Sequence, residues 1–141
     1  MLELYKKLIS EHSKSVFNVG KPSSFTVSKR GWNRLCGDEI VLYCSAVQED
    51  ILEIWYECKG CALCKASCAI LVNTQNLKSR DDILDSLNKF IRLDDSFDDP
   101  IQTLLTAKKF PARLKCVTLA WQTLIECLQL NSKEDIYATT E

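Results

Sequence analysis

The junction near residue 60, where a strand pattern changes into a helical one, constrains the fold more than any other feature. Residues 40–47 and 51–58 are both rich in β-branched and aromatic side chains, and a polar turn of three residues separates them. Two such runs predict an antiparallel β-hairpin. From Cys61 to about Asn73 the residues favour a helix instead. Four of the eight cysteines lie at this junction and in the helix after it: Cys58, Cys61, Cys64 and Cys68.

The segments on either side of the hairpin predict helices joined by loops. In chain order we expect a helix at 2–14, a loop at 15–28 with a short strand near 25–27, a polar turn at 31–38, a helix capped by Asp81-Asp82, a short helix after Pro100 and a long helix from Pro111. The predicted fold class is therefore α+β, with a small three-stranded antiparallel sheet and helices packed on one face. We expect one domain at residues 1–130 and a polar tail at residues 131–141.

Length, charge and composition are those of a globular protein and argue against several functional classes. With 18 basic and 19 acidic residues the net charge is −1, which does not favour binding to nucleic acid or to an anionic membrane. No apolar run approaches the roughly 20 residues that cross a bilayer, and the N-terminus lacks the apolar core of a signal peptide. A single histidine, with no nucleophile motif around any serine, argues against hydrolase chemistry. We therefore expect a cytoplasmic protein with no nucleic-acid or membrane partner.

A cytoplasmic location decides how the cysteines are interpreted. In a reducing compartment structural disulfides are rare, so a cysteine-rich chain indicates metal or redox chemistry. Thiolate is the ligand that zinc and iron–sulfur clusters prefer. A cysteine in the first turn of a helix, as predicted for Cys61, also lies near unpaired N–H groups that favour the thiolate. Chemistry should therefore centre on this cysteine.

Candidate metal ligands lie in three separate parts of the chain. Cys36-Gly37-Asp38 places a thiol and a carboxylate two residues apart, and the glycine lets the backbone turn so that both face one point. Cys61 follows the hairpin, and Cys116 lies one to two turns into the helix that begins at Pro111. Three cysteines and one aspartate can bind zinc in tetrahedral geometry, and the same set can hold the irons of a cluster. The predicted metal ligands are Cys36, Asp38, Cys61 and Cys116.

These ligands stand in segments that resemble the IscU, NifU N-terminal and SufU family of iron–sulfur cluster assembly scaffolds. The matching segments, in the same order as in that family, are Asn33 to Asp38, Gly60-Cys61 with Ala66-Ser67, and Phe110 to Cys116. The resemblance covers about residues 2–128 and is closer to SufU than to IscU. IscU proteins have a histidine directly before the third cysteine, where this chain has Lys115.

The resemblance implies a function as well as a fold. SufU-type proteins bind zinc through the residues matching the four ligands and receive sulfur from a cysteine desulfurase, with the cysteine matching Cys36 as the acceptor. IscU-type proteins instead build a two-iron cluster on the same cysteines. We therefore expect zinc or an iron–sulfur cluster as the cofactor, and a cysteine desulfurase and downstream cluster-accepting proteins as partners. Such a chain is a sulfurtransferase-type acceptor rather than a turnover enzyme. Arg113 and Lys115 are auxiliary candidates that hold nearby thiolates charged or steer a persulfide, or else are a solvated helix start.

Three further cysteines depart from the family pattern and leave another interpretation open. The spacing Cys58-x2-Cys61-x2-Cys64-x3-Cys68 fits a bacterial ferredoxin loop, which makes a ferredoxin-like electron-transfer or cluster-carrier protein the alternative. On a helix, however, Cys61, Cys64 and Cys68 share one face. There Cys64 and Cys68 either extend the metal site or pack in the core. Cys58, next to the ligand turn, is an auxiliary candidate for a disulfide or a redox role.

Overall fold

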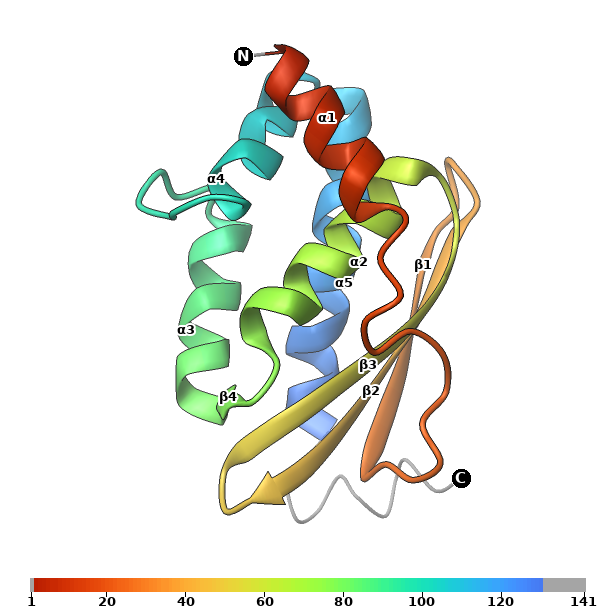
Figure 1. Ribbon diagram of the computed structural model, residues 1–141, viewed down its shortest axis with the longest axis vertical. Helices are drawn as coiled ribbons and strands as arrows, with labels where there is room; N and C mark the ends of the chain where they lie inside the picture. Colours follow the sequence, from red (N-terminus) through yellow and green to blue (C-terminus); the bar gives the residue numbers. More distant parts are fainter. Residues whose placement is uncertain (1, 131–141) are drawn as a thin grey trace.

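The computed structural model describes residues 2–130, and Figure 1 shows a sheet with helices packed against one of its faces. The predicted tail at 131–141 lies outside the described residues. In chain order the elements are α1 (Leu2–His12), β1 (Val27–Asn33), β2 (Asp38–Gln48), β3 (Ile51–Lys59), α2 (Ala62–Gln75), β4 (Lys78–Ser79), α3 (Arg80–Ile91), α4 (Ile101–Leu104), the 3-10 helix η1 (Leu105–Lys109) and α5 (Pro111–Leu130). The α+β prediction is confirmed.

The sheet has four strands in the described residues, not the three that the sequence predicts. Their order is β1-β2-β3-β4 and all neighbours are antiparallel. The predicted hairpin is present as β2 and β3, with Leu42 opposite Tyr56. The additional strand, β4, has two residues and pairs with the start of β3. Two residues are too few to show the alternation by which a strand is predicted.

Residues 31–33, predicted as part of a polar turn, form the end of β1 instead. Gly31 and Asn33 are buried and Trp32 is exposed, which is the alternation of a strand with one covered face. A Cβ atom at Gly31 would collide with Thr123 of α5, so the glycine lets the last helix lie close to the sheet. The turn between β1 and β2 is therefore limited to residues 34–37.

The helices lie within a few residues of their predicted segments, with one change of cap. Ser79, not Asp81-Asp82, caps α3, because its Oγ accepts a hydrogen bond from the N–H of Asp82 at 3.1 Å. The two aspartates occupy the first turn, where their negative charge is favourable to the helix dipole.

Trp121 of α5 lies at the centre of the packing between the helices. Its indole stacks on Phe90 of α3 with ring centroids 3.8 Å apart, and its Nε1–H donates to Oγ of Ser67 in α2 at 3.0 Å. The Ser67 hydroxyl in turn donates to the carbonyl of Val117 at 2.6 Å. These buried contacts hold α2, which begins just after Cys61, against α5, which contains Cys116.

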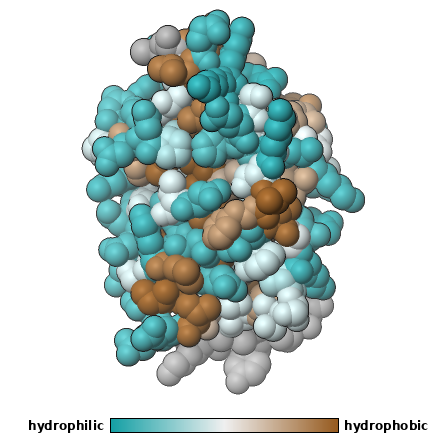
Figure 2. Space-filling model, in the orientation of Figure 1, coloured by the Kyte–Doolittle hydropathy of each residue, from teal (hydrophilic) through white to brown (hydrophobic). Residues whose placement is uncertain are grey.

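Three segments meet at the upper end of the molecule in Figure 1: the turn at 34–37, the β3–α2 junction and the first turns of α5. They carry the predicted ligands. On the face shown in Figure 2 most of the surface is hydrophilic, and apolar side chains occupy separate patches. Within residues 2–130 no helix combines the length and the apolar character needed to cross a membrane.

Candidate metal centre

The turn between β1 and β2 places Cys36 at the surface and Asp38 in the interior. The side chain of Asn33 accepts a hydrogen bond from the N–H of Leu35 at 3.1 Å, and its carbonyl accepts one from the N–H of Gly37 at 2.8 Å. Gly37 has a φ of 73°, in the left-handed region that glycine adopts without strain. The turn brings the Cys36 Sγ to 2.9 Å from Oδ2 of Asp38.

Asp38 is fully buried and links two of the three segments. Its Oδ1 accepts a hydrogen bond from the backbone N–H of Cys61 at 2.9 Å. Burial by itself raises the pKa of this carboxyl. Hydrogen bonds from Cys36, the Cys61 backbone, Cys116 and the Cys61 thiol outweigh that effect and hold the pKa below its ordinary value. The carboxylate is thus kept ionised among the thiols, as a metal ligand must be.

Cys61 is the N-cap residue of α2 and so precedes the first helical turn in which it was predicted. Its Sγ accepts a hydrogen bond from the N–H of Cys64 at 3.4 Å and lies 3.8 Å from Oδ2 of Asp38. Arg113 reaches this sulfur from α5, with Nη2 at 3.9 Å. Lys115 is exposed and lies instead beside a surface hollow that Trp32 and residues 33–35 also line.

Cys116 completes the arrangement from α5. Its Sγ lies 3.6 Å from that of Cys36, and burial together with the Cys36 contact raises the pKa of its thiol. The ligand atoms of Cys36, Asp38 and Cys116 all lie within 4.8 Å of one another. Two sulfurs bound to one tetrahedral zinc, each about 2.3 Å from it, are about 3.8 Å apart. The spacings within this group of three therefore fit zinc, and the Cys61 sulfur lies beside it, 3.8 Å from Oδ2 of Asp38.

Gly60 is a residue of the site that sequence reasoning did not single out. A Cβ atom there would collide with Oδ1 of Asp38 and come within 2.9 Å of its Cγ. The signal was available, since a glycine directly before a predicted ligand at a strand–helix junction indicates a close approach of the backbone. Asn33 was noted only as part of the family-like segment, and its hydrogen bonds to the turn were not predicted.

Replacement of Gly60 by alanine should therefore weaken metal binding. The added methyl group must displace the Asp38 carboxylate, and we expect zinc affinity to fall by about 10–100-fold, as for other changes that misorient a ligand. Competition with a zinc chelator measures this. Gly31→Ala is the matched control, because its methyl group collides with Thr123 rather than with a ligand. It should lower stability and leave zinc affinity unchanged; equal affinity in the two variants would contradict the prediction.

The lowered pKa of Asp38 predicts a pH dependence of stability in the zinc-free protein. The folded pKa lies below the unfolded value of about 3.9, so the ionised carboxylate stabilises the fold above about pH 4. That contribution is lost as the pH falls through the folded pKa. Urea unfolding between about pH 3 and 6 should show a steeper loss of stability in the wild type than in Asp38→Asn. Parallel curves for the two proteins would show that this carboxylate is not responsible.

The other cysteines lie outside this group. Cys58, Cys64 and Cys68 form a second group whose sulfurs also lie within 4.8 Å of one another. The prediction that Cys61 shares one helix face with Cys64 and Cys68 is wrong. Cys61 caps the helix and turns toward Asp38, and Cys58 of β3 joins the two helical cysteines instead. In this group hydrogen bonds from Cys64 and Cys68 lower the pKa of the Cys58 thiol.

Cys44 and Cys127 are buried, with their sulfurs 3.8 Å apart, in the core.

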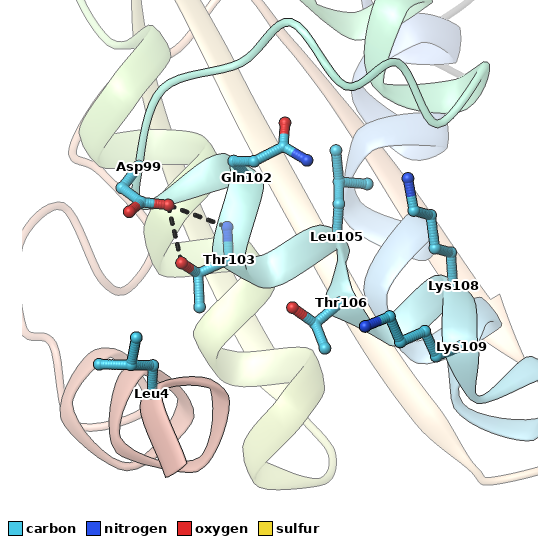
Figure 3. Close-up of a pocket in the computed structure, with 8 residues that line it drawn as sticks. All are labelled: Leu4, Asp99, Gln102, Thr103, Leu105, Thr106, Lys108 and Lys109. Atoms are coloured by element: carbon cyan, nitrogen blue, oxygen red, sulfur yellow. Dashed lines mark hydrogen bonds between the residues drawn. The ribbon is translucent and has the colours of Figure 1, made fainter. Parts of the chain in front are cut away.

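A separate hollow of about 480 Å³ lies between α1 and the α4–η1 segment (Figure 3). Its Asp99 carboxylate accepts hydrogen bonds from the N–H and the Oγ of Thr103 at 3.1 and 2.7 Å. The side chains that line it carry no thiol, so it is not part of the cysteine chemistry.

No family model matches the chain, but curated relatives do. The iron–sulfur cluster assembly scaffold protein IscU of Thermotoga maritima is 28% identical over 137 residues, which cover 92% of this chain and 96% of the relative. The zinc-dependent sulfurtransferase SufU of Bacillus subtilis is 32% identical over 130 residues, which cover 86% of each protein. This chain belongs to the IscU/SufU family. The resemblance noted in the sequence is thereby confirmed.

Solved structures place the IscU/SufU-family chain in the same fold. A protein described as an iron–sulfur cluster assembly scaffold of the SUF system, from Fervidobacterium islandicum, superposes with a TM-score of 0.81 at 27% identity, covering 89% of this chain and 97% of that one. The N-terminal part of a NifU-like protein from Brucella abortus has a TM-score of 0.79 at 16% identity, covering 90% and 93%. The second likeness concerns the fold alone.

Proposed function

We propose that this chain accepts sulfur during iron–sulfur cluster assembly, with Cys36 as the acceptor and a zinc ion held by Cys36, Asp38, Cys61 and Cys116. The observation that carries the proposal is the grouping of the Cys36, Asp38 and Cys116 ligand atoms within 4.8 Å of one another, with the Cys61 sulfur 3.8 Å from Asp38 and with Cys36 at the surface. Among the eight cysteines, all within the described residues, Cys36 is the exposed one. The name of the SufU relative, a zinc-dependent sulfurtransferase, supports the same function.

The donor set fits zinc because it offers three thiols and one carboxylate, with Cys36, Asp38 and Cys116 closely grouped and Cys61 within 3.8 Å of Asp38. Bound zinc would supply positive charge that keeps the thiols deprotonated at neutral pH. Asp38 holds the backbone of Cys61 in place, and Arg113 offers a positive charge to the Cys61 sulfur. The same ligands can hold the irons of a cluster, so a cluster assembled there from the accepted sulfur is the product that this function leads to.

The transfer is a thiolate–persulfide exchange. The Cys36 thiolate attacks the outer sulfur of a persulfide on the catalytic cysteine of a desulfurase. A new S–S bond forms at Cys36, the S–S bond of the donor breaks, and the donor cysteine leaves as a thiolate. To enter a cluster as sulfide, this sulfur must be reduced by two electrons from an external reductant and combined with iron; the finished cluster would then pass to downstream cluster-accepting proteins. We place this chemistry in the cytoplasm, in keeping with the unpaired cysteines.

A direct test compares zinc-loaded and zinc-stripped protein. Each is mixed with a cysteine desulfurase and labelled cysteine, and sulfane sulfur bound to the chain is measured together with zinc content. The proposal predicts about one sulfur per chain, located on Cys36 by peptide mass analysis, and only in the zinc-loaded sample. Labelling of another cysteine, or equal labelling without zinc, would contradict it.

Leu35 gives the proposed partner a place to bind. It precedes the acceptor and is 83% exposed, beside a shallow hollow of about 400 Å³. An exposed apolar side chain next to the reacting sulfur suits a desulfurase that must bring its persulfide to Cys36. Leu35→Asp should therefore slow transfer by about 10-fold or more while zinc content stays unchanged. Val47→Asp, at the far end of β2, is the control and should transfer normally; a normal rate in both variants would remove Leu35 from the docking surface.

The ferredoxin-like alternative is not favoured. It requires Cys58, Cys61, Cys64 and Cys68 to bind one cluster, yet the run divides between two groups, with Cys61 turned toward Asp38. The relatives named above are cluster assembly scaffolds and a sulfurtransferase, not electron carriers.

A further inference from the structure

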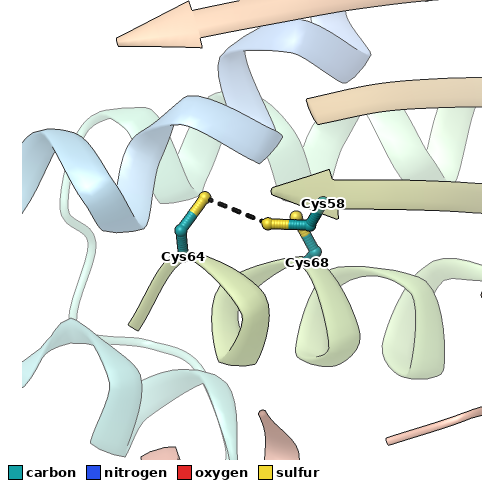
Figure 4. Close-up of side chains that lie close together, drawn as sticks. All are labelled: Cys58, Cys64 and Cys68. Atoms are coloured by element: carbon teal, nitrogen blue, oxygen red, sulfur yellow. Dashed lines mark hydrogen bonds between the residues drawn. The ribbon is translucent and has the colours of Figure 1, made fainter. Parts of the chain in front are cut away.

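A second group of thiols lies behind the first, between the end of β3 and the first two turns of α2. Cys58 comes from the strand, and Cys64 and Cys68 lie one turn apart on the helix, so that the three sulfurs point toward one another (Figure 4). The Cys58 and Cys64 sulfurs are 3.6 Å apart, and all three lie within 4.8 Å. Cys64 and Cys68 are fully buried and Cys58 is partly exposed.

We propose that these three cysteines form a second metal site, a three-sulfur site for a single soft ion of the Cu(I) class. It is distinct from the site proposed for zinc, because the two groups share no ligand. The proposal does not depend on sulfur transfer and adds a metal-binding activity to the chain.

The spacing of the sulfurs fits a metal ion. Three sulfurs about 2.3 Å from a central ion in a trigonal plane are about 4.0 Å apart. The distances in the group, from 3.6 Å to at most 4.8 Å, allow this geometry after shifts of a few tenths of an ångström. Two of the ligands stand on one helix and the third on a paired strand, so rigid elements hold all three in position.

The number and kind of ligands indicate the class of ion. Thiolates bind Cu(I) as well as zinc, but structural zinc is almost always four-coordinate and this group offers three sulfurs. Asp38 is not available as a fourth ligand, because its two carboxylate oxygens accept hydrogen bonds from the Cys36 thiol and from the backbone N–H of Cys61. The buried positions of Cys64 and Cys68 leave little access for water as a fourth ligand. A three-sulfur environment that is mostly dry therefore suits a soft monovalent ion better than zinc.

The test is an anaerobic titration of the zinc-loaded chain with Cu(I), in competition with a chromophoric Cu(I) chelator. We expect one Cu(I) per chain with retention of one zinc, and copper X-ray absorption showing three sulfurs at about 2.3 Å. Cys64→Ala and Cys68→Ala should each weaken Cu(I) binding by about 100-fold or more, because loss of a ligand exceeds the 10–100-fold cost of changes around a ligand. Their zinc content should be unchanged, which separates this site from the first.

The controls use the same kind of substitution elsewhere in the core. Cys44→Ala and Cys127→Ala remove buried thiols that lie outside the group and should leave Cu(I) affinity unchanged. Cys58→Ala, at a partly exposed position, repeats the test if a helical variant fails to fold. The proposal is overturned if Cu(I) binds equally well to the Cys58, Cys64 and Cys68 variants, if it binds only by displacing zinc from Cys36, or if the group takes up a second zinc instead.

Discussion

Replacement of Cys36 by alanine should abolish the acceptance of sulfur from a desulfurase. The thiolate at this position is the proposed nucleophile, and the other cysteines are partly or fully buried and cannot reach a persulfide held by a partner. Labelled sulfur bound to the chain should fall to background. Cys61→Ala and Cys116→Ala should have the same effect, because each removes a proposed ligand that holds the group together.

A ligand role and an acceptor role can be separated in this experiment. In the wild type, mass analysis should find one added sulfur atom on the peptide containing Cys36. Circular dichroism and zinc content are recorded for each variant. The matched control is Cys127→Ala, which removes a buried cysteine of α5 outside both groups and should leave sulfur acceptance normal. Sulfur uptake at the wild-type level in Cys36→Ala would remove this residue from the mechanism.

Replacement of Trp121 by alanine should lower the free energy of unfolding more than any of the other substitutions proposed above. The side chain is fully buried, stacks on Phe90 and donates to Ser67, whose hydroxyl is then left with one contact fewer. Truncation of a buried aromatic side chain costs about 3–5 kcal/mol, and the lost hydrogen bond is part of that cost. Urea unfolding of the zinc-free protein measures the change.

Two further variants at tryptophan positions show where the effect originates. Trp121→Phe retains an aromatic ring against Phe90 and loses the hydrogen bond to Ser67, so it should cost about 1–2 kcal/mol. Trp32→Ala removes an exposed ring and should change the free energy of unfolding by about 0.5 kcal/mol or less. If Trp121→Ala unfolded at the same urea concentration as Trp32→Ala, the packing described for α2 and α5 would be wrong.

The hairpin and the long helices were predictable because their signals are local. Alternation in 51–58 and the proline at the start of α5 depend on nearby residues only. The two-residue strand β4 has no such signal, since it is defined by its pairing with β3. The sequence predicted Asp81-Asp82 as the cap of α3, but an N-cap residue stands before the first turn and not within it, and Ser79 holds that position.

The residues of the candidate site could be proposed from the sequence, but the way in which the cysteines divide between two groups could not. The family-like segments pointed to Cys36, Asp38 and Cys116, whose ligand atoms the fold brings together. Helical spacing could not show that Cys61 faces Asp38, because a cap residue lies outside the regular helix. Nor could it show that Cys58 joins the helical thiols, since that contact depends on how β3 packs against α2.

Zinc X-ray absorption on the purified chain tests the central claim most directly. If Cys36, Asp38, Cys61 and Cys116 hold the ion, the spectrum should show three sulfurs at about 2.3 Å and one oxygen at about 2.0–2.2 Å. Asp38→Ala should remove the protein oxygen, and Cys68→Ala should leave the spectrum unchanged. A zinc ion with only sulfur ligands, altered by Cys68→Ala and not by Asp38→Ala, would contradict the account.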